Sequence, residues 1–247
     1  MTAYTQAAAS RLPRGWLHFA LQLAIWVGFY VAYQIARGAA DRSVERAFAN
    51  GQWIIDFQRG LGSMMELTLQ GAIEGSGLMT QVTSYTYWLS QFAVIGIALL
   101  WTYFRAHERF FALRNTLILA NLIGLVGYVT LPTAPPRKFP EAGFVDTLAR
   151  HAAVSHDSSL VSFTSNPYAA MPSLHSADAL IVGVVMAAVV RRPWAKALWL
   201  AWPAWVWFSV MATGNHFWLD IAAGIVVAAV AAAIVYRRPL VRRLRQA

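Results

Sequence analysis

The chain has 247 residues, of which 58% are hydrophobic and only 13% are charged. Soluble domains carry about 25% charged and about 45–50% apolar residues. The composition therefore argues against an ordinary soluble protein and predicts a membrane protein. The sequence contains no cysteine, which excludes disulfides and thiolate chemistry. The formal net charge of +9 would suit a nucleic-acid partner only if the basic residues formed a patch or stripe.

Six apolar stretches reach or approach the length of about 20 residues that crosses a bilayer as a helix. In chain order they are 16–36, 78–104, 115–132, 172–190, 196–213 and 217–236. The first is too long for the core of a signal peptide and no small-residue cleavage site follows it, so we expect it to stay in the mature protein. We predict an all-α polytopic membrane protein, a single domain over 1–247 that forms a six-transmembrane-helix bundle.

Most of the basic residues lie in short connections at the ends of these stretches. They precede the first stretch, separate the second from the third and the fourth from the fifth, and follow the sixth: Arg11, Arg14, Arg105, Arg109, Arg114, Arg191, Arg192, Lys196 and the arginines of 237–247. With six spans they all fall on one side, which the positive-inside rule makes the cytoplasmic side of a cell membrane. Both termini are therefore predicted to be cytoplasmic. The basic tail 237–247 is predicted to contact anionic lipid headgroups, and we expect no nucleic-acid partner.

The segment 37–77, between the first two spans, shows helical spacing of its apolar residues. We expect interfacial amphipathic helices here, lying along the outer surface of the membrane and shaping an entrance for a lipid. A cap that packs over the bundle is an equally good interpretation of any single residue in this segment.

Three motifs place polar groups at the ends of apolar stretches. PTAPPRKF, with Arg137, follows the third stretch; AAMPSLHSADAL, with His175, opens the fourth; and TGNHFWLDIAAG, with His216 and Asp220, opens the sixth. An ionisable group beside a membrane-spanning helix predicts a functional site. In the six-span topology all three motifs lie on the extracytoplasmic side, and we therefore predict that they form one site there.

The first property of this site is its affinity for an anion. The fourth and sixth helices both point their N-termini toward it, and helix N-termini attract negative charge. Arg137 and Lys138 supply positive charge, and Ser173 and Asn215 can cap a helix or donate hydrogen bonds. These four residues are predicted to bind phosphate.

The second property is a pair of histidines with an orienting carboxylate. Asp220 lies one helical turn after His216 and can hold its Nδ1 proton, which leaves Nε2 free as a nucleophile. His175 can then serve as general acid and base, and this mechanism requires no metal or other cofactor. Two alternatives stay open. His175, His216 and Asp220 could be three ligands of zinc, or each could be an ordinary helix cap, interfacial residue or local hydrogen-bond partner.

Several polar residues near the motifs have no assigned role. Asp178, one turn after His175, either tunes that histidine, contacts a headgroup or faces a polar seam between helices. Asp146, His151 and His156 lie in the long outer loop without motif support.

At these motifs the chain resembles the type 2 phosphatidic acid phosphatase superfamily, whose members carry K-x(6)-R-P, P-S-G-H and S-R-x(5)-H-x(3)-D in that order. Arg137 matches the arginine of the first motif. His175 in PSLHS matches the second, with Leu174 in place of glycine. His216 and Asp220 in NHFWLD match the third.

The departures from these motifs point to a particular branch. The lysine position of the first motif holds Thr130, its proline position holds Lys138, and the arginine position of the third motif holds Val210. The strings PTAPPR, NPYAAMPSLH and TGNHFWLD, and the stretch 53–70, are similar to inositol phosphorylceramide synthases and their bacterial relatives. The resemblance spans roughly 53–225.

The resemblance implies an integral membrane enzyme that forms a phosphohistidine at His216, with His175 as acid and base and Asp220 as the orienting partner. It implies a metal-independent lipid phosphatase if water attacks the intermediate. If a small alcohol such as inositol attacks, the enzyme is a headgroup transferase between lipids. The expected partners are a lipid phosphate substrate and membrane lipids. A small transporter with polar residues along a substrate path and a structural membrane scaffold are the alternatives from other classes; the sequence does not indicate the lipid or the oligomeric state.

Overall fold

The computed structural model describes residues 12–40, 43–147 and 166–244, with side chains described up to 237. The helices are α2 (Gly15–Ala39), α3 (Val44–Gly60), α4 (Met65–Glu74), α5 (Gly77–Leu89), the π-helical segment η1 (Ser90–Val94), α6 (Ile95–Arg105), α7 (His107–Thr130), the 3₁₀ turns η2 (Pro136–Lys138) and η3 (Pro140–Ala142), α10 (Leu174–Val189), α11 (Pro193–Ala212) and α12 (Trp218–Leu244). Within the described ranges no β-strand forms, apart from one isolated bridge between Thr133 and Ala169. The all-α prediction is confirmed.

Four helical segments are long and apolar enough to cross a membrane: Gly15–Ala39, Gly77–Arg105, His107–Thr130 and Trp218–Arg237. These four indicate a membrane protein. The remaining two predicted spans are helices as well, but α10 has 16 residues, or about 24 Å at 1.5 Å per residue, against a hydrocarbon core of about 30 Å. Helix α11 has 20 residues, with Pro203 in its interior. The count of six spans therefore stays a prediction.

The third long helix begins earlier than the sequence suggested. We expected it at 115, but α7 begins at His107, because a single residue, Ala106, separates it from α6. Charged residues expected in a loop, such as Arg109 and Arg114, therefore lie in the first two turns of α7. At the other end of the chain, α12 continues to Leu244, so most of the basic tail continues the helix; 245–247 lie outside the described residues.

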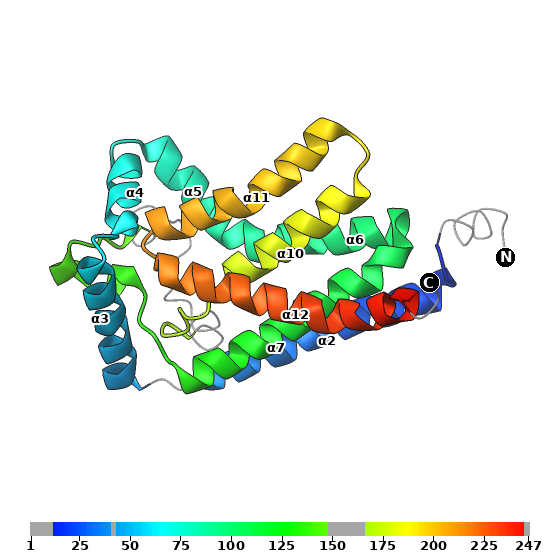
Figure 1. Ribbon diagram of the computed structural model, residues 1–247, viewed down its shortest axis with the longest axis horizontal. Helices are drawn as coiled ribbons and strands as arrows, with labels where there is room; N and C mark the ends of the chain where they lie inside the picture. The colour runs from blue at the N-terminus through cyan, green and yellow to red at the C-terminus, as the bar shows by residue number, and fades with distance from the viewer. Residues whose placement is uncertain (1–11, 41–42, 148–165, 245–247) are drawn as a thin grey trace.

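The long helices lie side by side and alternate in direction (Figure 1). The beginning of α2, the turns α6–α7 and α10–α11, and the end of α12 gather at one end of the bundle. Helices α3 and α4, the connections 131–147 and 166–173, and the turn before α12 gather at the other end, where α3 lies across the bundle (Figure 1). All three polar motifs belong to this second end.

Two apolar clusters hold the helices in place around that end. The larger one joins buried residues of α6, α7, α10 and α12, among them Leu113, Leu117 and Val182. A smaller one fixes α3 to the 131–147 connection and to the residue after His216, through Ile54, Ile55, Phe139, Phe144 and Phe217. The second cluster sets the position of the polar turn before α12.

Helix α12 approaches the start of α10 very closely at Gly224. A Cβ atom added there would lie 2.2 Å from the carbonyl oxygen of Ser173 and 3.0 Å from Cβ of Ser176. Only glycine fits this approach, because the nearest atom belongs to the backbone and cannot move aside. The contact brings the N-termini of α10 and α12, and thus the two histidine motifs, next to each other.

Candidate active site

A cavity lies at the end of the bundle that carries the three motifs. Its walls come from α2, α5, η1, α7 and α10, from the connections 131–147 and 166–173, and from the turn before α12. His175 and His216 both line it, and so do Arg137 and Asn215. The structure thus brings one group from each motif to the same cavity.

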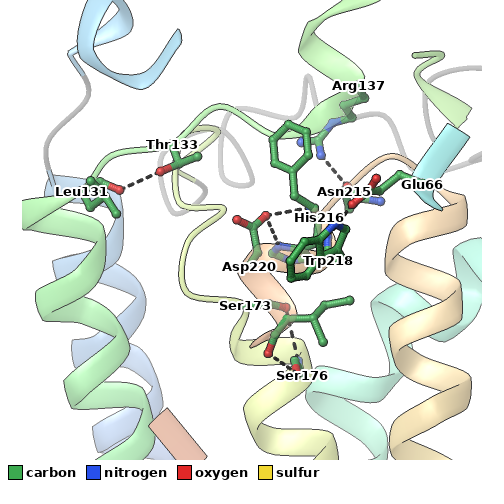
Figure 2. Close-up of polar contacts among 12 residues, drawn as sticks. Glu66, Leu131, Thr133, Arg137, Ser173, Ser176, Asn215, His216, Trp218 and Asp220 are labelled. Carbon is green, nitrogen blue, oxygen red and sulfur yellow. Dashed lines mark hydrogen bonds and ion pairs between the residues drawn. The ribbon is translucent and has the colours of Figure 1, made fainter. Parts of the chain in front are cut away.

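His216 sits in the turn just before α12 and is held from both sides. Its Nδ1 atom lies 3.4 Å from Oδ2 of Asp220, and the same Oδ2 accepts a hydrogen bond from the backbone nitrogen of Phe217 at 2.9 Å. The backbone nitrogens of Asn215 and His216 both donate to the carbonyl oxygen of Val210. Figure 2 shows Asp220 next to the His216 ring, with Asn215 on its other side.

His175 lies in the first turn of α10 and faces His216. The two ring centroids are 5.6 Å apart, and the planes are tilted by 56°. The His175 ring stacks on Tyr87 of α5, with centroids 4.4 Å apart, and hydrogen-bonds to the Tyr87 backbone. Stacking on Tyr87 restricts the plane of the His175 ring, which faces His216 across the cavity.

Arg137 reaches the same turn from η2. Its Nη1 atom donates a hydrogen bond to Oδ1 of Asn215 (Figure 2), its Nε lies 3.7 Å from Asp146, and its backbone nitrogen donates to the carbonyl oxygen of Gly214 at 2.9 Å. Gly214 has φ +67°, a conformation that other residues rarely adopt. The glycine therefore lets the turn fold tightly under Arg137.

Two predicted phosphate-binding residues lie elsewhere. Lys138 is exposed and is absent from the lining of the cavity. Ser173 is fully buried and caps α10, where its Oγ accepts a hydrogen bond from Ser176 N and its backbone nitrogen donates to Asp220 O (Figure 2). Of the four predicted phosphate contacts, the cavity contains Arg137 and Asn215.

Asp178, which lines the same cavity as the two histidines, is part of a polar seam between helices. Its carboxylate accepts hydrogen bonds from Nε2 of Gln91 at 2.8 Å and from Nδ2 of Asn121 at 3.0 Å. Gln91 belongs to the π-helical segment η1, and such segments occur frequently at functional sites. Of the three roles left open for Asp178, the structure shows the polar seam between helices, here between η1, α7 and α10.

The sequence analysis missed Glu66, which holds the beginning of α12. Its Oε1 atom accepts hydrogen bonds from Nε2 of Gln58 at 2.8 Å and from the backbone nitrogen of Trp218 (Figure 2). Burial raises the pKa of Glu66 above its ordinary value of 4.5, although these hydrogen bonds act in the opposite direction. Glu66 lies in the stretch 53–70 that resembles the inositol phosphorylceramide synthases, and this resemblance was the signal that could have found it.

It also missed Arg37, in the last turn of α2, which lines the cavity together with both histidines. Its guanidinium carbon lies 5.8 Å from the centroid of the Tyr128 ring. Arg37 lies one residue beyond the predicted first span, and no role was assigned to it. A basic residue directly at the outer end of an apolar span, where the positive-inside rule does not favour positive charge, was the signal that could have found it.

The electrostatic setting keeps His216 neutral. Burial lowers its pKa to about 3, and the positive charge of Arg137 acts in the same direction, against a backbone hydrogen bond with Ala170. A neutral imidazole has a free lone pair at neutral pH and can act as a nucleophile. The zinc alternative gains no support, since no three histidine, aspartate or glutamate side chains of the described residues form a group that could hold a metal.

Comparison with known proteins agrees with the geometry. Residues 52–234 match the family model of the PAP2 superfamily, so the chain belongs to this superfamily, and the resemblance predicted from the motifs is confirmed. A curated relative is the phosphoinositol dihydroceramide synthase of Bacteroides thetaiotaomicron, 28% identical over 156 residues that cover 57% of this chain and 50% of the relative. The chain thus spans about half the length of this relative. No solved structure matches it significantly.

Proposed function

We propose that the protein is an integral membrane lipid phosphatase or phosphotransferase that works through a phosphohistidine at His216. The observation that carries this proposal is the arrangement of His216, backed by Asp220 and facing His175 across a cavity that also contains Arg137. Membership of the PAP2 superfamily supports the same reaction class.

In the first step, Nε2 of neutral His216 attacks the phosphorus of the lipid phosphate. The P–N bond forms while the bond between phosphorus and the lipid oxygen breaks, and His175 gives its proton to that oxygen. Asp220 holds the ring and stabilises the positive charge that develops on it. Arg137 neutralises charge on the non-bridging phosphate oxygens, an effect worth about 10²–10³ in kcat for a single donor.

In the second step, His175 takes a proton from the acceptor, whose oxygen attacks the phosphohistidine. The P–O bond forms, the P–N bond breaks, and His216 is neutral again. Water as acceptor gives a phosphatase, and an alcohol gives a transferase. The name of the Bacteroides relative, a synthase of a phosphoinositol lipid, supports an alcohol acceptor.

We place the site on the extracytoplasmic face of a six-span bundle with both termini in the cytoplasm. The alternating directions of the long helices (Figure 1) and the basic residues at the end opposite to the cavity support this orientation. Helix α3 supports an interfacial position, because it buries Ile54 and Ile55 yet leaves Trp53 60% and Phe57 41% exposed. An apolar outer face on a helix across the bundle end suits a lipid surface.

The experiment is a set of lipid phosphates presented in EDTA to the purified protein, with release of inorganic phosphate as the readout. His216→Ala and Asp220→Asn are run beside the wild type, after their unfolding temperatures are shown to be unchanged. Release by the wild type that disappears in His216→Ala supports a phosphatase. If the wild type releases none, phospholipid donors and alcohol acceptors are tested for headgroup transfer. Failure of both reactions contradicts the proposal.

A further inference from the structure

Helix α2 gives the cavity a second arginine that no motif of the superfamily assigns. Arg37 lines the same cavity as His175, His216 and Arg137. Its Nε atom is buried and has no hydrogen-bond partner among the described residues. The half-buried side chain therefore keeps one buried donor, Nε, that no acceptor in the described part of the chain uses.

The charges around Arg37 leave its own charge unmatched. The carboxylate that lines the cavity, Asp178, is occupied by two side-chain amides, and Asp146 lies beside Arg137. The groups that act electrostatically on Arg37 are tyrosines: Tyr33, Tyr128, Tyr87 and Tyr30. A neutral ring face attracts a guanidinium through its quadrupole, but it does not neutralise the charge.

Arg37 is half-buried, and its Nε lies out of contact with solvent; a buried polar group without a partner is costly, and a ligand that supplies the opposite charge would offset this cost. The charge of Arg37 acts on both His175 and His216, which places it within electrostatic reach of the reacting atoms. A guanidinium can donate two parallel hydrogen bonds to two oxygens of one phosphate. Arg137 has already committed one nitrogen to Asn215, whereas the Arg37 Nε is unused.

We propose that Arg37 binds the phosphate group of the substrate together with Arg137, as a second guanidinium supplied by the first apolar helix. This inference rests on the proposed function, because it assumes a phosphate in this cavity. It explains how the site holds an anion although the motif positions Thr130 and Val210 carry no charge and Lys138 lies outside the cavity. Helix α2 would then be part of the substrate site as well as a membrane span.

The test measures binding without turnover. Purified protein in EDTA is titrated with inorganic phosphate and with a short-chain phosphonate analogue of phosphatidic acid, whose P–C bond cannot be cleaved, and the heat of binding gives Kd. The variants are Arg37→Gln, Arg37→Lys and the matched control Arg59→Gln, whose arginine is exposed on α3. We expect Arg37→Gln to weaken Kd by about tenfold to a hundredfold, the range for a hydrogen bond to a charged group. We expect Arg37→Lys to recover part of the loss and Arg59→Gln to bind like the wild type.

The outcomes separate this inference from the proposed function. If Arg37→Gln is folded and binds both ligands like the wild type, Arg37 has only a structural role against Tyr128 and the inference is wrong, while a phosphohistidine at His216 is unaffected. If Arg37→Gln and Arg37→Lys lower the unfolding temperature equally and lose binding equally, a structural role is again indicated. If the wild type itself binds neither ligand, the inference is wrong, while the proposed function is decided separately by the assays of phosphate release and headgroup transfer.

Discussion

The carboxylate of Glu66 accepts a hydrogen bond from the backbone nitrogen of Trp218, which lies 152 positions further along the chain at the first residue of α12. The donor is one of the N–H groups at a helix start that have no partner within the helix. Since Trp218 follows His216 by two residues, this hydrogen bond ties α4 to the turn that carries the proposed nucleophile. An element between the first two spans thus helps to position the catalytic turn.

Replacing Glu66 by alanine should destabilise the protein far more than replacing it by glutamine. Alanine removes the acceptor, which leaves the Trp218 N–H without a partner at a cost of about 1–3 kcal/mol and leaves the Gln58 amide with only its 3.4 Å hydrogen bond to the carbonyl oxygen of Ser63. Glutamine keeps an oxygen that can accept from both donors. Thermal unfolding in detergent measures the difference. Equal unfolding temperatures for the two variants would show that the hydrogen bonds from Glu66 do not stabilise the fold.

The stability should also depend on pH through Glu66. Because burial raises its pKa above 4.5, the folded state prefers the protonated carboxyl. Protonation of Glu66 therefore stabilises the folded state. This stabilisation is complete below pH 4.5, the ordinary pKa of a glutamate, and is lost as the pH rises through the raised pKa of the folded state. Glutamine does not titrate, so the unfolding temperature of Glu66→Gln should rise relative to the wild type over this interval and then level off. A difference that grows instead as the pH falls would contradict the assignment.

Arg137 and Lys138 are neighbours in sequence and should differ sharply in their effect on activity. Arg137 lines the cavity and its side chain is 12% exposed, whereas Lys138 is exposed outside it. Arg137→Ala should lower kcat by about 10²–10³, as the loss of a donor to the transition state does. Lys138→Ala should cause a much smaller loss. Steady-state kinetics on a lipid that is turned over in the proposed assay measures both effects, and a larger loss in Lys138→Ala than in Arg137→Ala would contradict this expectation.

Gly224→Ala should disrupt the contact between α10 and α12. The added Cβ would meet the backbone carbonyl of Ser173 at 2.2 Å, so one of the two helices must shift, at a cost of about 1–3 kcal/mol or more. The control is Gly28→Ala in α2, where an added Cβ meets nothing within 4 Å and alanine favours the helix. We expect a lower unfolding temperature and lower activity in Gly224→Ala alone. If Gly224→Ala has the same unfolding temperature and activity as the wild type, α10 and α12 are less closely packed than described.

Hydropathy and charge were sufficient to predict the helices and the meeting of the three motifs at one end. Both follow from local sequence, because a run of apolar residues fixes a span and the alternation of spans fixes which ends meet. The start of α7 was misplaced, because Arg109 and Arg114 were taken as a loop although charged residues fit well in the first turns of a helix beside the membrane surface.

The residues that were missed depend on distant contacts. Glu66 accepts a hydrogen bond from the backbone of Trp218, which is distant in sequence. Arg37 lines a cavity together with residues of α10 and of the turn before α12. No local sequence pattern predicts either of these contacts. Ser173 was predicted from a local pattern that had two interpretations, because a serine before a helix can either cap the helix or bind a phosphate. In the structure Ser173 is buried against α12 and caps α10.

The most direct test of the central claim is to trap the covalent intermediate. Protein mixed with a lipid substrate radiolabelled at phosphorus is quenched with denaturant and assayed for protein-bound label. We predict label on the wild type that is stable to base and labile to acid, as expected for phosphohistidine, and no label on His216→Ala. Label that persists in His216→Ala, or its absence in wild-type protein during active turnover, would contradict His216 as the nucleophile.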